Sequence, residues 1–108
     1  MIELPWPPSS LIPHARYKGG YKKANDTKKH RTACAWIAKT SKPIIEFKVE
    51  FYPPDKRKRD LMNTIGSCKA AIDGLQDAWG IDDNNFRIHW PLEFSDPVKN
   101  GKIIIKTV

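Results

Sequence analysis

The 108-residue sequence lacks a long apolar run, and no stretch approaches the ~20 apolar residues that a membrane-spanning helix needs. Its N-terminus also lacks a basic segment followed by an apolar one, the pattern of a secretory signal. We therefore expect a soluble, cytoplasmic protein that does not engage a membrane. Hydrophobic residues make up 40% of the chain, enough for one core, so we expect a single domain over residues 1–108.

The sequence has only two cysteines, Cys34 and Cys68, with no C-x-x-C pair and no histidine at zinc-ligand spacing. We expect two reduced, buried thiols. The phosphate-cradling G-x-x-x-x-G-K-[ST] loop is also absent, which argues against a nucleotide cofactor. His14, His30 and His89 have no Ser or Cys partner at a recognisable spacing, so a nucleophilic triad is not indicated. His30 is expected to face phosphate or solvent.

Positive charge is in excess. The chain has 19 Lys and Arg against 12 Asp and Glu, a formal charge of +7, which favours a polyanionic partner. The cations gather in two clusters, and several acids gather in the second half of the chain. This combination is typical of a nuclease, in which cations hold phosphates and carboxylates hold a metal. The predicted DNA-binding residues are Lys18, Lys22, Lys23, Lys28, Lys29 and Arg31 in the first cluster, and Lys56, Arg57, Lys58 and Arg59 in the second.

Hydrophobic spacing predicts a small α/β (α+β) domain, with a mixed sheet of about four strands, two main helices and the order β, α, β, α, β, β. A short edge strand at 2–4 is followed by a long basic loop at 9–25. Asp26 or Thr27 then caps a helix that continues to about residue 40. Its buried stripe is expected to consist of Ala33, Trp36, Ile37 and Thr40.

The clearest strand signal covers residues 45–52, where apolar and mostly charged residues alternate. Residues 64–79 carry apolar positions in steps of three and four, which predicts an amphipathic helix that ends at Gly80. Two more strands are expected at 86–94 and 102–107. Asn100-Gly101 favours a turn with positive φ, so these two strands are predicted to form a hairpin.

Acidic residues flank the predicted helix at 64–79. Asp60 lies before this helix and directly after four consecutive cations, and Asp82-Asp83 lie after the helix. A ~16-residue helix is ~24 Å long, so these carboxylates meet only if the flanking segments fold back or a dimer joins the two ends. Such a group beside a basic run suits Mg²⁺. The alternative is a solvated acidic turn at 82–85, which from spacing alone is the more common outcome.

Three segments carry a more specific signal. Residues 52–63 (YPPDKRKRDLMN), 69–75 (KAAIDGL) and 80–83 (GIDD) resemble the core of the RusA-type Holliday-junction resolvases. Residues 4–9 (LPWPPS) resemble the first strand and turn of that family, and residues 26–36 resemble a helix of its phage-type members. Together these segments cover most of the chain, in the family's order.

The resemblance implies a homodimer that makes paired, Mg²⁺-dependent incisions (Mn²⁺ being a possible substitute) in branched DNA, at four-way junctions of recombination and repair. Asp60 matches the first metal-binding aspartate of the family's R-x-D-x-D-N pattern. Asp82 and Asp83 match the paired aspartates after the helix, with Asp83 the better candidate for a direct ligand. Lys69 matches a helical lysine that contributes to catalysis. Two supporting residues are Asn63, which closes the motif, and Asp73, whose spacing allows it to pair with Lys69. The alternative for Asp73 is a solvated acid on the helix face.

One position departs from the family pattern. Met62 stands where the second aspartate is expected, and a thioether is a very poor ligand for Mg²⁺. Three explanations stay open: another carboxylate such as Asp73 substitutes, the site works with fewer protein ligands, or the protein binds junctions and cuts them slowly or not at all. The rival function is therefore a non-catalytic junction-binding protein derived from such nucleases.

Overall fold

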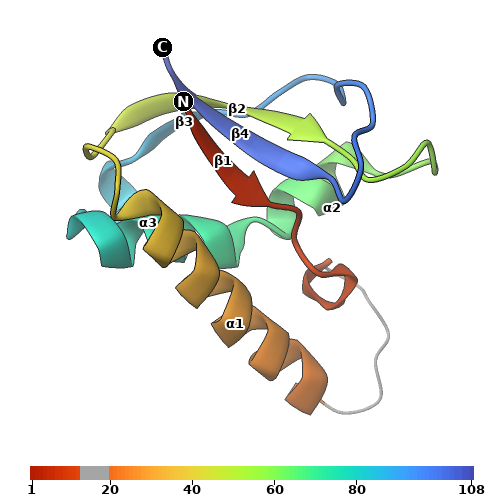
Figure 1. The fold of residues 1–108 in the computed structure, drawn as a ribbon, viewed down its shortest axis with the longest axis horizontal. Helices are drawn as coiled ribbons and strands as arrows, with labels where there is room; N and C mark the ends of the chain where they lie inside the picture. Colours follow the sequence, from red (N-terminus) through yellow and green to blue (C-terminus); the bar gives the residue numbers. More distant parts are fainter. Residues whose placement is uncertain (13–19) are drawn as a thin grey trace.

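In the computed structural model, the backbone is described for residues 1–12 and 20–108, and the side chains of residues 20 and 21 are left aside. A four-stranded sheet has the order β1-β4-β2-β3, and three helices lie on one side of it (Figure 1). This confirms the predicted fold class. The strands are β1 (Ile2–Pro5), β2 (Glu46–Tyr52), β3 (Arg87–His89) and β4 (Lys102–Thr107), and the helices are α1 (Gly20–Ala38), α2 (Leu61–Gly66) and α3 (Lys69–Trp79), with short 3-10 turns η1 (Ser9–Leu11) and η2 (Asp83–Asn85).

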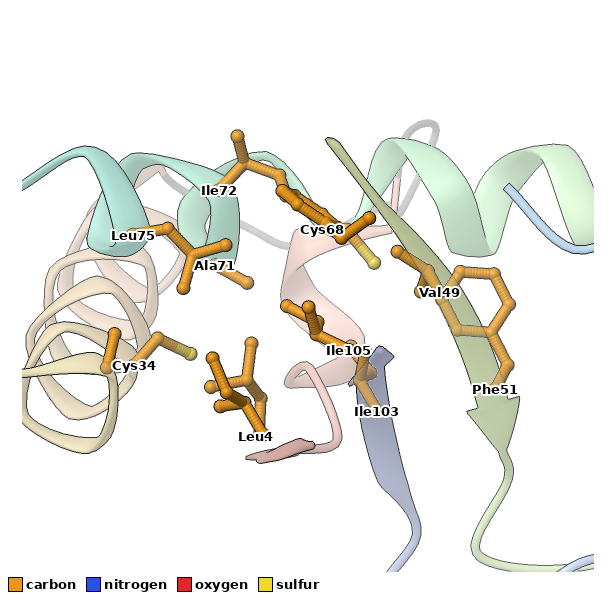
Figure 2. Packing of buried hydrophobic residues seen from close by; sticks show 13 residues of the cluster. Leu4, Cys34, Val49, Phe51, Cys68, Ala71, Ile72, Leu75, Ile103 and Ile105 are labelled. Carbon is orange, nitrogen blue, oxygen red and sulfur yellow. The ribbon is translucent and has the colours of Figure 1, made fainter. Parts of the chain in front are cut away.

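Alternation along β2 decides which face of the sheet is buried. Phe47, Val49 and Phe51 are buried, whereas the charged residues between them are exposed or half-buried. β4 runs antiparallel to β2, and its register places Ile105 opposite Val49 and Ile103 opposite Phe51. Burying such apolar side chains stabilises the fold by roughly 1.5–3 kcal/mol each. In Figure 2 the side chains of Ile103 and Ile105 extend from β4 into the core beneath the helices.

The predicted hairpin between residues 86–94 and 102–107 is wrong. β3 covers only Arg87–His89 and pairs parallel with β2, while β4 lies between β1 and β2. A parallel pair needs a crossover connection, which α2 and α3 supply. Beyond β3, the rings of Trp90 and Phe94 pack against Phe51 instead of extending the strand. The positive φ expected at Asn100 and Gly101 is confirmed, at 67° and 66°.

Helix α1 starts earlier and faces another way than the sequence predicts. It begins at Gly20, so Asp26 is inside the helix, where it accepts a hydrogen bond from Ser10 Oγ at 2.6 Å. The predicted stripe is also wrong, because Trp36 is 66% exposed. The buried positions are His30, Cys34 and Ala38, spaced by four residues.

The predicted helix at 64–79 is divided in two. α2 begins at Leu61, capped by Asp60, whose Oδ1 accepts from the Asn63 amide at 3.0 Å. The chain then turns at residues 67–68 before α3 begins. Gly80 ends α3 with a φ of 67°, as predicted.

Both cysteines are free and buried, as expected. Cys34 on α1 and Cys68 at the start of α3 belong to the core (Figure 2). Burial raises the pKa of each thiol to about 12. The thiols therefore stay protonated and unreactive in the folded chain.

We expect Gly74→Ala to lower the free energy of unfolding by about 1–2 kcal/mol, because overpacking outweighs the gain in helix propensity. A Cβ at Gly74 would lie 2.6 Å from the Arg31 carbonyl oxygen and 3.0 Å from the Ala35 nitrogen, both backbone atoms of α1. Urea denaturation measures the change.

The matched control is Gly66→Ala on α2, at an exposed position where φ is not positive. Here the better helix propensity of alanine is expected to leave stability unchanged or to raise it by up to about 1 kcal/mol. Equal effects of the two substitutions would contradict the close approach of α1 and α3.

The buried His30 makes stability depend on pH. His30 is only 5% exposed, so the prediction that it faces phosphate or solvent is wrong. Burial lowers its pKa. The unfolded chain, with a histidine pKa of about 6.5, then binds the proton more readily than the folded one. The folded state is therefore fully stable above about pH 6.5 and loses stability as the pH falls below that value. Urea midpoints between about pH 7.5 and pH 5 should show this loss. His30→Gln should flatten it, and the exposed His89→Gln should not.

Candidate functional site

The loop between β2 and α2 holds the second basic cluster. Arg59 organises it, because its Nη1 donates to the carbonyl oxygens of Asp55 at 3.1 Å and Arg57 at 3.0 Å. Its Nη2 is 2.9 Å from Asp55 Oδ1, and its guanidinium lies 5.7 Å from the centroid of the Trp6 ring. The Arg59 side chain is only 17% exposed. Arg59 therefore fixes the loop and is not a freely exposed phosphate ligand.

The other cations of this loop point to solvent. Lys56, Arg57 and Lys58 are all exposed. Arg57 has a single long ion pair, 4.0 Å to Asp55, and its side chain is 79% exposed. The pKa of Asp55 is lowered, first by the hydrogen bond from the Arg57 amide and then by Arg59. The loop thus presents three cations beside Asp60.

Lys69 is the centre of a charged network at the start of α3. Its Nζ lies 3.0 Å from Asp73 Oδ1, the pair expected from their i,i+4 spacing, and 3.4 Å from Asp83 Oδ2. The two carboxylates, with Asp73 the stronger influence, raise the pKa of Lys69. The strand–helix–strand crossover therefore brings Asp83 back alongside α3, a fold-back that the sequence allowed but did not require.

Arg31 connects this network to α1. Its Nε and Nη2 donate to the two carboxylate oxygens of Asp77, at 2.6 and 2.8 Å, and its Nη1 is 3.8 Å from Asp73. These contacts raise the pKa of Arg31 and lower that of Asp77. A bidentate pair of this kind fixes geometry as well as charge. Arg31, predicted to contact DNA, thus joins two helices.

The remaining cations of the first cluster lie mostly on the surface of α1. Lys23, Lys28 and Lys29 are exposed, and Lys22 pairs with Asp26 at 3.2 Å. Lys18 lies outside the described residues. The exposed lysines of α1 are available to a polyanion.

The structure assembles only part of the predicted carboxylate site. Lys69, Asp73 and Asp83 meet, but Asp60 is not in their network, and Asp82 instead caps η2, accepting from the Asn84 amide at 3.0 Å. Asp60 precedes α2, which at six residues is about 9 Å long. Within residues 1–12 and 20–108, no group of three His, Cys, Asp or Glu side chains is placed to hold a metal ion.

Met62 lies on α2, between Asp60 and Lys69 in the sequence, and is 72% exposed. An acid at this position would therefore be presented to solvent. In this chain the Lys69 ammonium group forms ion pairs with both Asp73 and Asp83.

One feature beside Asp60 is missed by the sequence interpretation. A cavity of about 430 Å³ lies between the N-terminal segment, the basic loop and α2, and its walls include Trp6, Pro54 and Asn63. The available signal in the sequence was the position of Trp6 within residues 4–9, a segment that resembles the resolvases.

Comparison with known proteins finds no family model that matches the chain. The sequence is 30% identical over 115 residues to an uncharacterised protein of Xylella fastidiosa (strain Temecula1), a match that covers 99% of this chain and 74% of that protein. Within the described part of the chain, no helix combines the length and apolar character needed to cross a membrane.

We expect Asp73→Asn and Asp83→Asn each to lower the pKa of Lys69, because each removes a carboxylate that stabilises the ammonium form. The effect of Asp73→Asn should be the larger. ¹³C NMR titration of the lysine Cε resonance measures it. Glu93→Gln, at an exposed site outside the network, is the control. An unchanged Lys69 titration in both network variants would contradict the contacts described here.

Proposed function

We propose that this chain, which belongs to the same family as the uncharacterised Xylella fastidiosa protein, is a metal-dependent endonuclease that cuts four-way DNA junctions. The observation that carries the proposal is the meeting of Lys69 and Asp83, two residues that match the resolvase pattern and come from different segments, with Asp73 as a second carboxylate beside Lys69. The basic loop that ends at Asp60 supports it, because it supplies exposed cations for the DNA backbone.

A homodimer suits this reaction. A four-way junction presents two strands related by two-fold symmetry, and one active site per subunit can cut both. Each subunit would contribute Lys56, Arg57 and Lys58, together with the exposed lysines of α1, to the binding of DNA. We propose that the protein acts on this DNA in the cytoplasm.

The donor chemistry fits a small ligand set for Mg²⁺. This ion is often held by one or two carboxylates, with substrate phosphates and water completing its shell. Asp73 and Asp83 each have an oxygen within 3.4 Å of one ammonium nitrogen, so they can face a shared cation. We assign these two as the ligands in this chain. A bound metal would supply charge stabilisation and an activated water.

The other predicted residues take different roles in the proposal. Asp82 shapes the turn that presents Asp83, through its hydrogen bond to the Asn84 amide. One carboxylate oxygen of Asp60 caps α2, and the other has no hydrogen bond among the described residues and can face DNA. Lys69, at the start of α3 beside both carboxylates, would contact a phosphate of the bound strand.

The second candidate function is junction binding without cleavage. Two observations favour it: Met62 is exposed where the family pattern has an aspartate, and no third carboxylate joins Asp73 and Asp83 in the described part of the chain. Binding would then depend on the cations alone and would be independent of a divalent metal.

A synthetic four-way junction with Mg²⁺ or Mn²⁺ separates the two functions. The enzyme predicts paired nicks, and Asp83→Asn should reduce their rate at least about 100-fold, since even outer-shell partners of a metal contribute roughly 10–100-fold. Glu93→Gln should cut at the native rate. Tight binding without nicks, with or without metal, would instead establish the binding protein.

Met62→Asp tests the departure from the family pattern in the same assay. A gain of about tenfold or more would indicate that a third carboxylate is what the native site lacks. Met62→Leu is the control for changing an exposed methionine. If the chain shows neither nicks nor a preference for four-way junctions over duplex DNA, both functions are excluded.

A further inference from the structure

The cavity beside Asp60 is built by three separate segments. Trp6, Pro7 and Ile12 come from the N-terminal part, Pro54 and the basic loop form a second wall, and α2 forms the floor. Its volume of about 430 Å³ falls within the range of small-molecule sites, roughly 300–1,000 Å³. It is therefore large enough for one nucleotide and too small for a duplex.

The floor of this cavity offers no free hydroxyl group. Thr64 Oγ1 donates to the Asp60 carbonyl oxygen at 3.0 Å, and Ser67 Oγ donates to the Thr64 carbonyl oxygen at 2.6 Å. Together with the proline and tryptophan walls, this makes a mainly apolar interior. A flat ring system can pack there without leaving either of these protein hydroxyl groups unsatisfied.

Positive charge at the cavity comes from one segment, the basic loop. Arg57 and Lys58 line the cavity and are exposed, whereas Arg59 is bound within the loop. Asp55, Asp60 and Asn63 also line it. An apolar interior with cations on one side matches a group that has a flat apolar body and one anionic end.

We propose that this cavity takes a single unstacked nucleotide of a DNA strand, with the base inside and its phosphate at Arg57 and Lys58. Because every base has a flat face that can pack on the tryptophan and proline walls, the site accepts different bases. The inference rests on the proposed function in one respect: the nucleotide belongs to a strand of the branched DNA that the basic loop, which lines the same cavity, would bind.

¹H–¹⁵N NMR with the full chain tests the inference without any cleavage. The probes are four-nucleotide oligothymidylate and oligoadenylate, with inorganic tripolyphosphate as an anion that has no base. We expect both oligonucleotides to shift the Trp6 indole and the Thr64 and Ser67 amides, and tripolyphosphate to shift only the loop amides. If all three probes perturb only the loop, the cavity holds no base and the inference is overturned.

Ile12→Trp gives a matched test, because it places a large side chain at the cavity wall. We expect it to weaken oligonucleotide binding about tenfold, as base stacking in such sites contributes ~1–3 kcal/mol. Tripolyphosphate binding should be unchanged. Ile37→Trp is the control, since both isoleucines are 37% exposed and Ile37 does not line this cavity. Equal oligonucleotide affinity in Ile12→Trp and native protein would overturn the inference.

These results are separable from those of the junction assay. Junction cleavage that survives while the oligonucleotides fail to enter the cavity would reject this site and keep the nuclease. Oligonucleotide binding in the cavity without any junction preference would reject the nuclease and leave a single-strand-binding site.

Discussion

The contact between α1 and α3 determines where the charged residues of this protein lie. Gly74 lets the two helices approach so closely that an added Cβ would clash with the α1 backbone. Arg31 locks the same crossing through its bidentate pair with Asp77 and its approach to Asp73. These contacts hold α3 against α1, and Lys69 at the start of α3 meets Asp83 after the crossover. The candidate site is thus a consequence of helix packing.

The parts of the fold that depend on local pattern could be predicted, and those that depend on pairing could not. The alternation over β2, the glycine stop at Gly80 and the positive φ at Asn100 are local properties of the chain. The hairpin prediction failed because nearness in sequence suggested that β3 and β4 pair. The insertion of β4 between β1 and β2 instead depends on the apolar faces of both neighbours.

The phase of α1 shows the same limit at the level of side chains. Large apolar residues suggest a buried stripe through Trp36, but a close helix crossing selects small residues at the contact, here Cys34 and Ala38. For the site, the pairing of Lys69 with Asp73 follows from spacing alone, whereas the arrival of Asp83 needs the three-dimensional crossover. The separation of Asp60 could not be predicted, because the break between α2 and α3 interrupts an otherwise continuous helical pattern.

Lys69 explains how this chain can hold the carboxylates of Asp73 and Asp83 close together. Two negative side chains facing one point would repel each other, and the ammonium group between them offsets this repulsion. The Lys69 side chain is 72% exposed, so water screens the pairs and the lysine can leave at little free-energy cost. In the proposed nuclease, Asp73 and Asp83 would hold the divalent ion, and the Lys69 ammonium group would lie beside them. The same side chain can therefore stabilise the free site and, in the proposed nuclease, turn to the phosphate of a bound strand.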